Sequence, residues 1–225
     1  LDKLDEKARA KVDSVLSETS IFRRLPIRVV QCDPDMYLFL VRQPDVVVNI
    51  WEVMGICQLA VKQIDEKTFS VVDRTGTCGT AEFLHSSPTT HIIYTEGAFE
   101  GAPLTIPARG RTLLVLKSGY VLEPDGRYYV TTRLDAFVQI EHGGLELLTK
   151  TFQPVVGRVA DMNFMQTAGF LGSLSRTAEV NASGMERLAG KLTQVQPEVR
   201  ARFVQLSMQV AERAALLPES NGSET

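Results

Sequence analysis

The feature that most constrains this chain is the separation of a strand-rich stretch, residues 57–141, from a helical stretch after it. Short apolar runs alternate there with turn residues. Glu123-Pro124-Asp125-Gly126 is the strongest turn, because Pro presets φ and Gly supplies a positive φ. Short turns favour antiparallel neighbours, and segregated strands and helices are typical of an α+β fold. We therefore predict a curved antiparallel sheet of six to seven strands, wrapped around a long C-terminal helix.

The predicted strands share the turn-bounded, β-branched pattern of a half-buried sheet. They are Ile27–Gln31, Gln58–Ile64, Phe69–Asp73, Thr77–Leu84, His91–Phe99, Arg109–Tyr120 and Tyr128–Glu141. The last is the clearest: Val130, Leu134, Ala136, Val138 and Ile140 share one face of it. After Gly144 the apolar period becomes helical, and we predict a main helix from about Val155 to near Val180, with Pro154 causing a kink or a restart.

Helices also flank the strands. Residues 1–25 have apolar positions at helical spacing, and two short helices follow, opened by Asp33-Pro34-Asp35 and Gln43-Pro44-Asp45, since Asp caps a helix and Pro suits its first position. We predict an N-terminal helical extension at 1–25, a core domain at 26–192, a C-terminal helix at 193–217 and a disordered tail at 218–225.

Composition and charge exclude several classes of protein. The chain has 225 residues and a formal net charge of -3 with a pI of about 5.7, whereas a general nucleic-acid binder is usually basic. The longest uncharged run, Met162–Ser175, is shorter than the roughly 20 apolar residues of a membrane span. Because the sequence begins with Leu1, a removed signal peptide would leave no trace, so the compartment stays open, cytoplasmic or exported.

No motif indicates a cofactor or a metal. Cys32, Cys57 and Cys78 are odd in number and widely spaced, which favours free thiols over a disulfide framework. Neither a P-loop, nor a dinucleotide-binding glycine motif, nor a nucleophile elbow occurs. We therefore predict no cofactor, no metal site and no catalytic residue.

At the start of the core domain the sequence resembles a known superfamily. Asp33-Pro34, Tyr37, Phe39-Leu40, Pro44 and Trp51, followed by the strands and the long helix, are similar to the opening of START-like (SRPBCC) domains, which include Bet v 1-like and polyketide cyclase-like proteins. Residues 46–55 resemble a stretch of uncharacterised bacterial members. The resemblance implies a helix-grip fold with a deep hydrophobic cavity between sheet and C-terminal helix, in which members bind lipids, sterols or polyketides and a minority catalyse cyclisation or dehydration.

If such a cavity exists, several side chains are candidates for binding its ligand. Each of them could instead have a purely structural role. Trp51 could stack on a ligand or anchor the core. Tyr94 and Glu96 share one face of a strand, and form a polar pair in the cavity only if that face points inward; its register stays open. On the main helix, Asn163 could bind a ligand or the sheet. The remaining candidates are apolar: Phe99, Met162 and Met165.

Other polar residues favour structural roles. His85 and His91 flank a turn and could meet as metal ligands, but two solvent-exposed histidines at a loop edge are the favoured interpretation. Arg133 and Asp135 are expected to pair on the outer face of the sheet.

The leading hypothesis is non-enzymatic binding of a hydrophobic small molecule, lipid-like or aromatic, in a cavity between sheet and helix. The alternatives are a cyclase or dehydratase that uses Glu96 with Tyr94 or a histidine, and an interaction module that docks or forms a homodimer through its terminal helices. The extra helices could pack on the outer sheet, close one cavity mouth, or mediate dimerisation.

Overall fold

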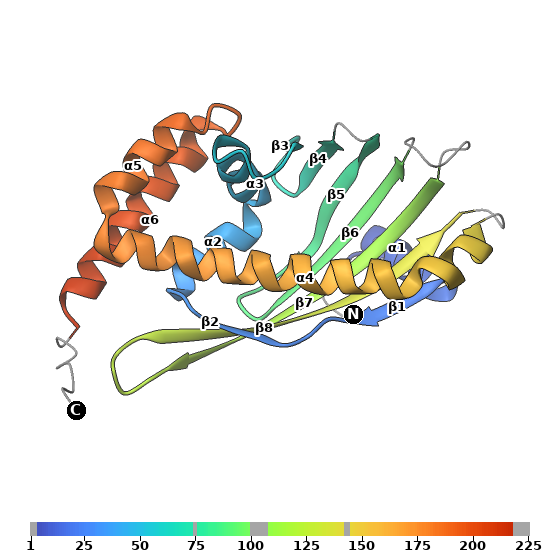
Figure 1. Cartoon of the computed structure of the whole chain (residues 1–225), viewed down its shortest axis with the longest axis horizontal. Helices are drawn as coiled ribbons and strands as arrows, with labels where there is room; N and C mark the ends of the chain where they lie inside the picture. Colours follow the sequence, from blue (N-terminus) through green and yellow to red (C-terminus); the bar gives the residue numbers. More distant parts are fainter. Residues whose placement is uncertain (1–3, 74–75, 100–107, 142–144, 218–225) are drawn as a thin grey trace.

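The computed structural model describes residues 4–73, 76–99, 108–141 and 145–217, which form six helices and eight strands (Figure 1). The helices are α1 (Glu6–Ser17), α2 (Pro34–Arg42), α3 (Pro44–Val53), α4 (Leu145–Val180), α5 (Ala182–Lys191) and α6 (Pro197–Ala215). The strands are β1 (Ile21–Arg24), β2 (Arg28–Gln31), β3 (Leu59–Gln63), β4 (Thr68–Asp73), β5 (Thr77–Ser86), β6 (Thr90–Phe99), β7 (Ala108–Leu122) and β8 (Tyr128–Ile140).

All eight strands form one antiparallel sheet in the order β1-β8-β7-β6-β5-β4-β3, and β2 pairs with β8 beyond the end of β1. The predicted α+β class, with a curved antiparallel sheet and a long C-terminal helix, is confirmed. The predicted six to seven strands were too few, because β1 lies inside the stretch expected to be helical. Phe22 there pairs with Phe137, and their ring centroids are 4.8 Å apart, so cross-strand packing favours a strand.

The sheet has two distinct faces. We call the face on which α1 packs the outer face, and the opposite face, on which α2, α3 and α4 lie, the inner face. Figure 1 shows α1 behind the sheet and α4 in front of it. On the outer face the apolar side of α1 is buried against Tyr94 and Leu113. On the inner face the Tyr37 hydroxyl, from α2, lies 2.8 Å from Ser118 Oγ and 3.2 Å from Thr132 Oγ1.

The two short helices start as their sequence predicts. Asp33 caps α2 by accepting hydrogen bonds from the backbone N–H groups of Asp35 and Met36, at 3.0 and 3.1 Å. Pro34 and Pro44 occupy the first position of α2 and α3. The long helix is one element from Leu145 to Val180, so it does not restart at Pro154.

Helices α5 and α6 belong to the main core rather than extending from it. Figure 1 shows them at the end of α4 nearest α2 and α3. Phe203 of α6 is fully buried, and its ring stacks on Phe39 of α2 with centroids 6.0 Å apart. Leu206 and Val210 of α6 join the same apolar cluster, together with Leu171 of α4. The apolar core therefore continues across residue 193.

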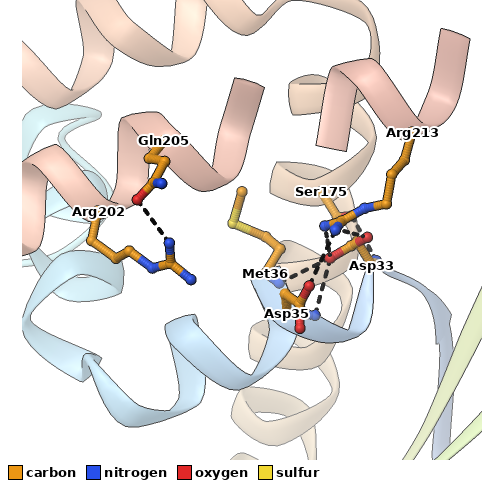
Figure 2. Close-up of polar contacts among 7 residues, drawn as sticks. All are labelled: Asp33, Asp35, Met36, Ser175, Arg202, Gln205 and Arg213. Carbon is orange, nitrogen blue, oxygen red and sulfur yellow. Dashed lines mark hydrogen bonds and ion pairs between the residues drawn. The ribbon is translucent and has the colours of Figure 1, made fainter. Parts of the chain in front are cut away.

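An ion-pair clamp reinforces this junction (Figure 2). Arg213 of α6 donates to Asp33 at 2.9 Å and to Asp35 at 3.2 Å, where both carboxylates lie at the positive start of α2. Ser175 of α4 accepts from the backbone N–H of Asp33 at 2.9 Å. Three segments far apart in sequence therefore meet at the first turn of α2.

The closest approach of α4 to the sheet depends on glycine. A Cβ added to Gly172 would lie 3.0 Å from the carbonyl oxygen of Gln31 and 3.1 Å from Val30 Cβ, whereas one added to Gly169, three residues earlier, would have no atom within 4 Å. Glycine at position 172 lets α4 lie directly on β2, and glycine at position 169 leaves open space.

This contrast predicts opposite effects for two neighbouring substitutions. Gly169→Ala should raise the free energy of unfolding by about 1 kcal/mol, since alanine is the better helix former. Gly172→Ala should lower the free energy of unfolding by up to about 2 kcal/mol, because the clash of the added Cβ with β2 outweighs the better helix propensity of alanine. Urea unfolding of both variants provides the measurement, and equal changes would contradict the close contact of α4 and β2.

Candidate functional site

The inner face divides into a buried half and a more open half. The side chains of the inner face that lie under α2 and α3 are buried. Phe69 and His91 have no exposed surface, and Phe83 is 7% exposed. Val48 of α3 packs against Phe69 and Phe83 there. This half is solid core.

The other half of the inner face is only half-buried, and we call it the open half. Strand pairing places its side chains together, because directly opposed residues point to the same side of a sheet. They are Gly79, Ala81, Ile93, Thr95, Gly97, Thr112, Leu114, Ala136 and Val138. None carries a charge. An apolar surface on the inner side of a sheet that is not fully buried is a surface on which a ligand can lie.

A row of three glycines crosses the sheet at the edge of the open half. Gly97 of β6 lies directly opposite Gly79 of β5 and Gly110 of β7. A Cβ added to Gly79 would lie 2.5 Å from the Glu96 carbonyl oxygen, and one added to Gly97 would lie 2.6 Å from that of Cys78. Glycines at such positions allow a sheet to curve sharply, and they leave its inner surface without side chains.

Two hydroxyl groups are the polar side chains of the open half. Thr95 and Thr112 are directly opposite each other on β6 and β7. Among the described residues neither hydroxyl has a hydrogen-bond partner in the protein. Each can donate and accept a hydrogen bond, so the pair can orient a ligand that carries one carbonyl or hydroxyl.

Trp51 is the predicted site residue that lies on the inner side of the sheet, beside its buried half. Its half-buried ring, from α3, is 5.5 Å from the Phe170 ring of α4, and it packs against the cluster that contains Phe69 and Phe83. It therefore joins α3 to α4 above the sheet. A role in binding stays a prediction.

Tyr94 and Glu96 lie on the outer face, which resolves the register that the sequence left open. Tyr94 is opposite Leu113 and 6% exposed beneath α1, and its hydroxyl donates to Glu96 at 2.9 Å. Burial, and then the Glu96 hydrogen bond and charge, raise the pKa of Tyr94 to about 12. The Glu96 carboxylate is 54% exposed and lies 3.5 Å from Arg111. This pair lies across the sheet from the open half.

The three predicted residues on α4 are exposed rather than buried against the sheet. Met162 is 51% exposed, Met165 is 39% exposed, and Asn163 is also exposed. Ala168, Leu171 and Leu174 of α4 enter the core, and the two methionines do not, so the expectation that Met162 and Met165 face the cavity under α4 was wrong. Phe99 is the last residue of β6, and its side chain lies outside the described part of the structure.

The histidines do not match the expected solvent-exposed pair. His91 is fully buried on the inner face and His85 is half-buried. Neither ring nitrogen of His91 has a hydrogen-bond partner among the described residues, and burial, with the charges of Arg42 and His85, lowers its pKa to about 4. Since Glu96 is on the opposite face, the structure does not bring it together with His91; of the partners that the cyclase hypothesis names, it pairs Glu96 with Tyr94. His142 lies outside the described residues.

The remaining polar predictions concern pairing and thiols. Asp135 lies on the outer face and accepts from Arg24 at 2.8 Å, with Arg133 at 3.9 Å, so the expected pairing is confirmed, but Asp135 itself is buried. Cys32, Cys57 and Cys78 are free. Within residues 4–73, 76–99, 108–141 and 145–217, no three metal-ligating side chains gather, and no helix is long and apolar enough to span a membrane.

The sequence did not single out Ile93 and Leu114, which are central to the open half. The signal was present in β8, where Ala136 and Val138 were correctly placed on one face. To deduce which residues of β7 and β6 lie on the same face as Ala136 and Val138, one needs the register in which the strands pair. The sequence alone does not show that register.

Comparisons with known proteins give fold-level neighbours. No family model matches the chain, and no curated protein matches its sequence. A conserved protein from Geobacillus kaustophilus has a TM-score of 0.45 at 10% identity, covering 63% of this chain and 88% of its own. Truncated norcoclaurine synthase from Thalictrum flavum has a TM-score of 0.38 at 9% identity (66% and 93% covered). A hypothetical protein from Helicobacter pylori has a TM-score of 0.35 at 10% identity (57% and 75% covered).

Proposed function

We propose that this protein is a START-like binding protein that holds an uncharged, largely apolar small molecule on the open half of the inner face. The observation that carries the proposal is the half-buried, charge-free surface of Ile93, Leu114 and Ala136 on the inner face of a curved sheet. The resemblance of Asp33-Pro34 and the residues that follow to START-like domains supports it independently.

The chemistry of this surface selects the ligand. Arg23 of β1, directly opposite Ala136, is the neighbouring cation, and it is already paired with Asp161. A charged group placed on this surface would therefore lose hydration for little gain, which costs several kcal/mol. An apolar ligand that buries about 200 Å² there gains roughly 5 kcal/mol at 25 cal/mol per Å². One hydrogen bond to the Thr95 and Thr112 hydroxyls would orient it. Binding by shape and apolar contact requires no catalytic group, and Tyr94 with Glu96 lies on the other face.

The test uses N-phenyl-1-naphthylamine, a neutral apolar fluorophore whose emission rises in an apolar environment. We expect saturable binding to the wild-type protein. Ala81→Trp, on the open half, should reduce the affinity at least tenfold, because the indole fills the surface that the probe would cover. Thr80→Trp is the matched control: Thr80 is the neighbouring residue, exposed on the outer face, and its substitution should leave binding unchanged.

Extraction of the purified protein under denaturing conditions, followed by mass spectrometry, identifies a ligand carried through purification. An uncharged apolar compound present in the wild-type protein and depleted in Ala81→Trp supports the proposal. Equal probe affinity in Ala81→Trp and the wild type, with both folded by circular dichroism, would refute it.

A further inference from the structure

A hollow lies between α4 and β2, at the edge of the sheet. It has a volume of about 470 Å³, and it is lined by Arg28 of β2 and by Arg158, Met162, Met165 and Gly169 of α4. The lining residues of α4 recur every three or four positions, so they form one face of the helix. That face is separate from the one that Leu171 and Leu174 bury in the core. The hollow is therefore distinct from the open half of the inner face.

The apolar part of this hollow is exposed without an evident structural need. Met162 and Met165 expose 51% and 39% of their surface, and a Cβ at Gly169 would meet no atom within 4 Å. Methionine side chains are flexible and polarizable, and they adapt to apolar ligands of varied shape. The volume lies within the range of small-molecule sites, about 300–1,000 Å³.

The polar part of the hollow is positive. Within the described part of the chain, neither Arg28 nor Arg158 makes a hydrogen bond or an ion pair. Asp161, the carboxylate of the lining, is already engaged: it accepts two hydrogen bonds from Arg23, one of them at 2.8 Å. That pairing lowers the pKa of Asp161, so the carboxylate stays ionised, and the Arg23 charge balances it. Two arginines that no described residue pairs, beside two exposed methionines, are complementary to an anionic head group attached to an apolar tail.

We propose that the hollow between α4 and β2 is a second binding site, which takes a free anionic amphiphile such as a medium-chain carboxylate. The head group accepts hydrogen bonds from Arg28 and Arg158. The tail lies over Met162, Met165 and the open space at Gly169. Because a carboxylate held by two guanidinium groups keeps its charge, the site prefers the ionised amphiphile to its neutral analogue.

The experiment uses NMR of the full chain with ¹³C-labelled methionine methyl groups, titrated with laurate. The six methionines supply internal controls: Met54 and Met208 are exposed elsewhere, and Met36 and Met185 are buried. We expect laurate to shift the Met162 and Met165 signals saturably and to leave the Met54 and Met208 signals in place. Dodecanol, with the same chain length and no charge, should bind at least tenfold more weakly.

Variants separate the contributions of charge and space. Arg28→Gln with Arg158→Gln should weaken laurate binding at least tenfold. Gly169→Leu should abolish it by filling the hollow, while Gly190→Leu, at a glycine of α5 where a Cβ also meets no atom within 4 Å, should have no effect. The laurate-induced shifts should persist in Ala81→Trp, in which the open half is blocked, so this site and the proposed function can fail independently.

Three results would overturn the proposal. Laurate could shift all four exposed methionines alike, which indicates nonspecific contact. Dodecanol could bind as tightly as laurate, which removes the role of the arginines. Finally, the protein could sediment with phosphatidylglycerol vesicles without any laurate-induced shift, which would make the surface a membrane contact instead.

Discussion

Replacing Phe203 by alanine is expected to lower the free energy of unfolding by about 3–5 kcal/mol, the usual cost of removing a fully buried aromatic ring. Phe203 has no exposed surface, and its ring stacks on Phe39 at 6.0 Å. A domain is typically stable by 5–15 kcal/mol in total, so this single change would remove a large share. Urea unfolding followed by circular dichroism measures the change.

Met208→Ala provides the matched control in the same helix. Met208 is 44% exposed, so its truncation should change the free energy of unfolding by less than about 1 kcal/mol. Equal effects of the two substitutions would show that α6 is a loosely attached extension. The same packing bears on deletion experiments: removing residues 193–225 would uncover the core around Phe203, so an altered elution volume would report unfolding rather than a lost dimer contact.

The parts of the fold that local chemistry determines were predictable. Asp33 and Pro34 start α2 as expected, because a cap and a fixed φ act within a few residues. The antiparallel sheet followed from short turns between β-branched runs. In contrast, the strand β1 was missed, since its four residues depend on pairing with β8 more than a hundred residues later. The inclusion of α6 in the core was missed for the same reason, because its amphipathic pattern shows that one face is buried but not which element covers that face.

The candidate site was less predictable, because it depends on which side of the sheet each strand presents. Tyr94 and Ile93 are adjacent in sequence but lie on opposite faces of the sheet. Tyr94 lies beneath α1 on the outer face, and Ile93 lies on the inner face. A register change of one residue would exchange them. Met162 and Met165 were predicted as ligand contacts of the cavity under α4, and they line the hollow between α4 and β2 instead.

Acidification is expected to destabilise the protein through His91. Its pKa is lowered to about 4 in the folded protein, against about 6.5 for an unperturbed histidine, because burial, Arg42 and His85 all disfavour the charged ring. Between these two pH values the unfolded chain binds more protons than the folded one. The contribution of His91 to stability is therefore complete above pH 6.5 and is lost as the pH falls towards 4. The full loss is about 3 kcal/mol, at 1.36 kcal/mol for each unit of pKa.

His91→Leu isolates this contribution. Leucine fills a similar volume and has no nitrogen to desolvate, and neither ring nitrogen of His91 has a partner to lose among the described residues. At pH 7 the variant should be at least as stable as the wild type. The difference in free energy of unfolding between the variant and the wild type should then grow by about 3 kcal/mol between pH 7 and pH 4. Taking that difference cancels the other titrating groups, including Glu179 and Asp45, whose raised pKa values give the opposite trend.

His85→Gln serves as the control, because His85 is half-buried on the neighbouring strand and can keep its hydration. It should leave most of the pH dependence in place. If His91→Leu and the wild type lost stability in parallel down to pH 4, His91 would have to accept a proton in the folded state without cost. That result requires a hydrogen-bond acceptor at the ring, and the described structure places none there. Parallel curves would therefore contradict the packing of α2 and α3 on the inner face, on which the boundary of the open half depends.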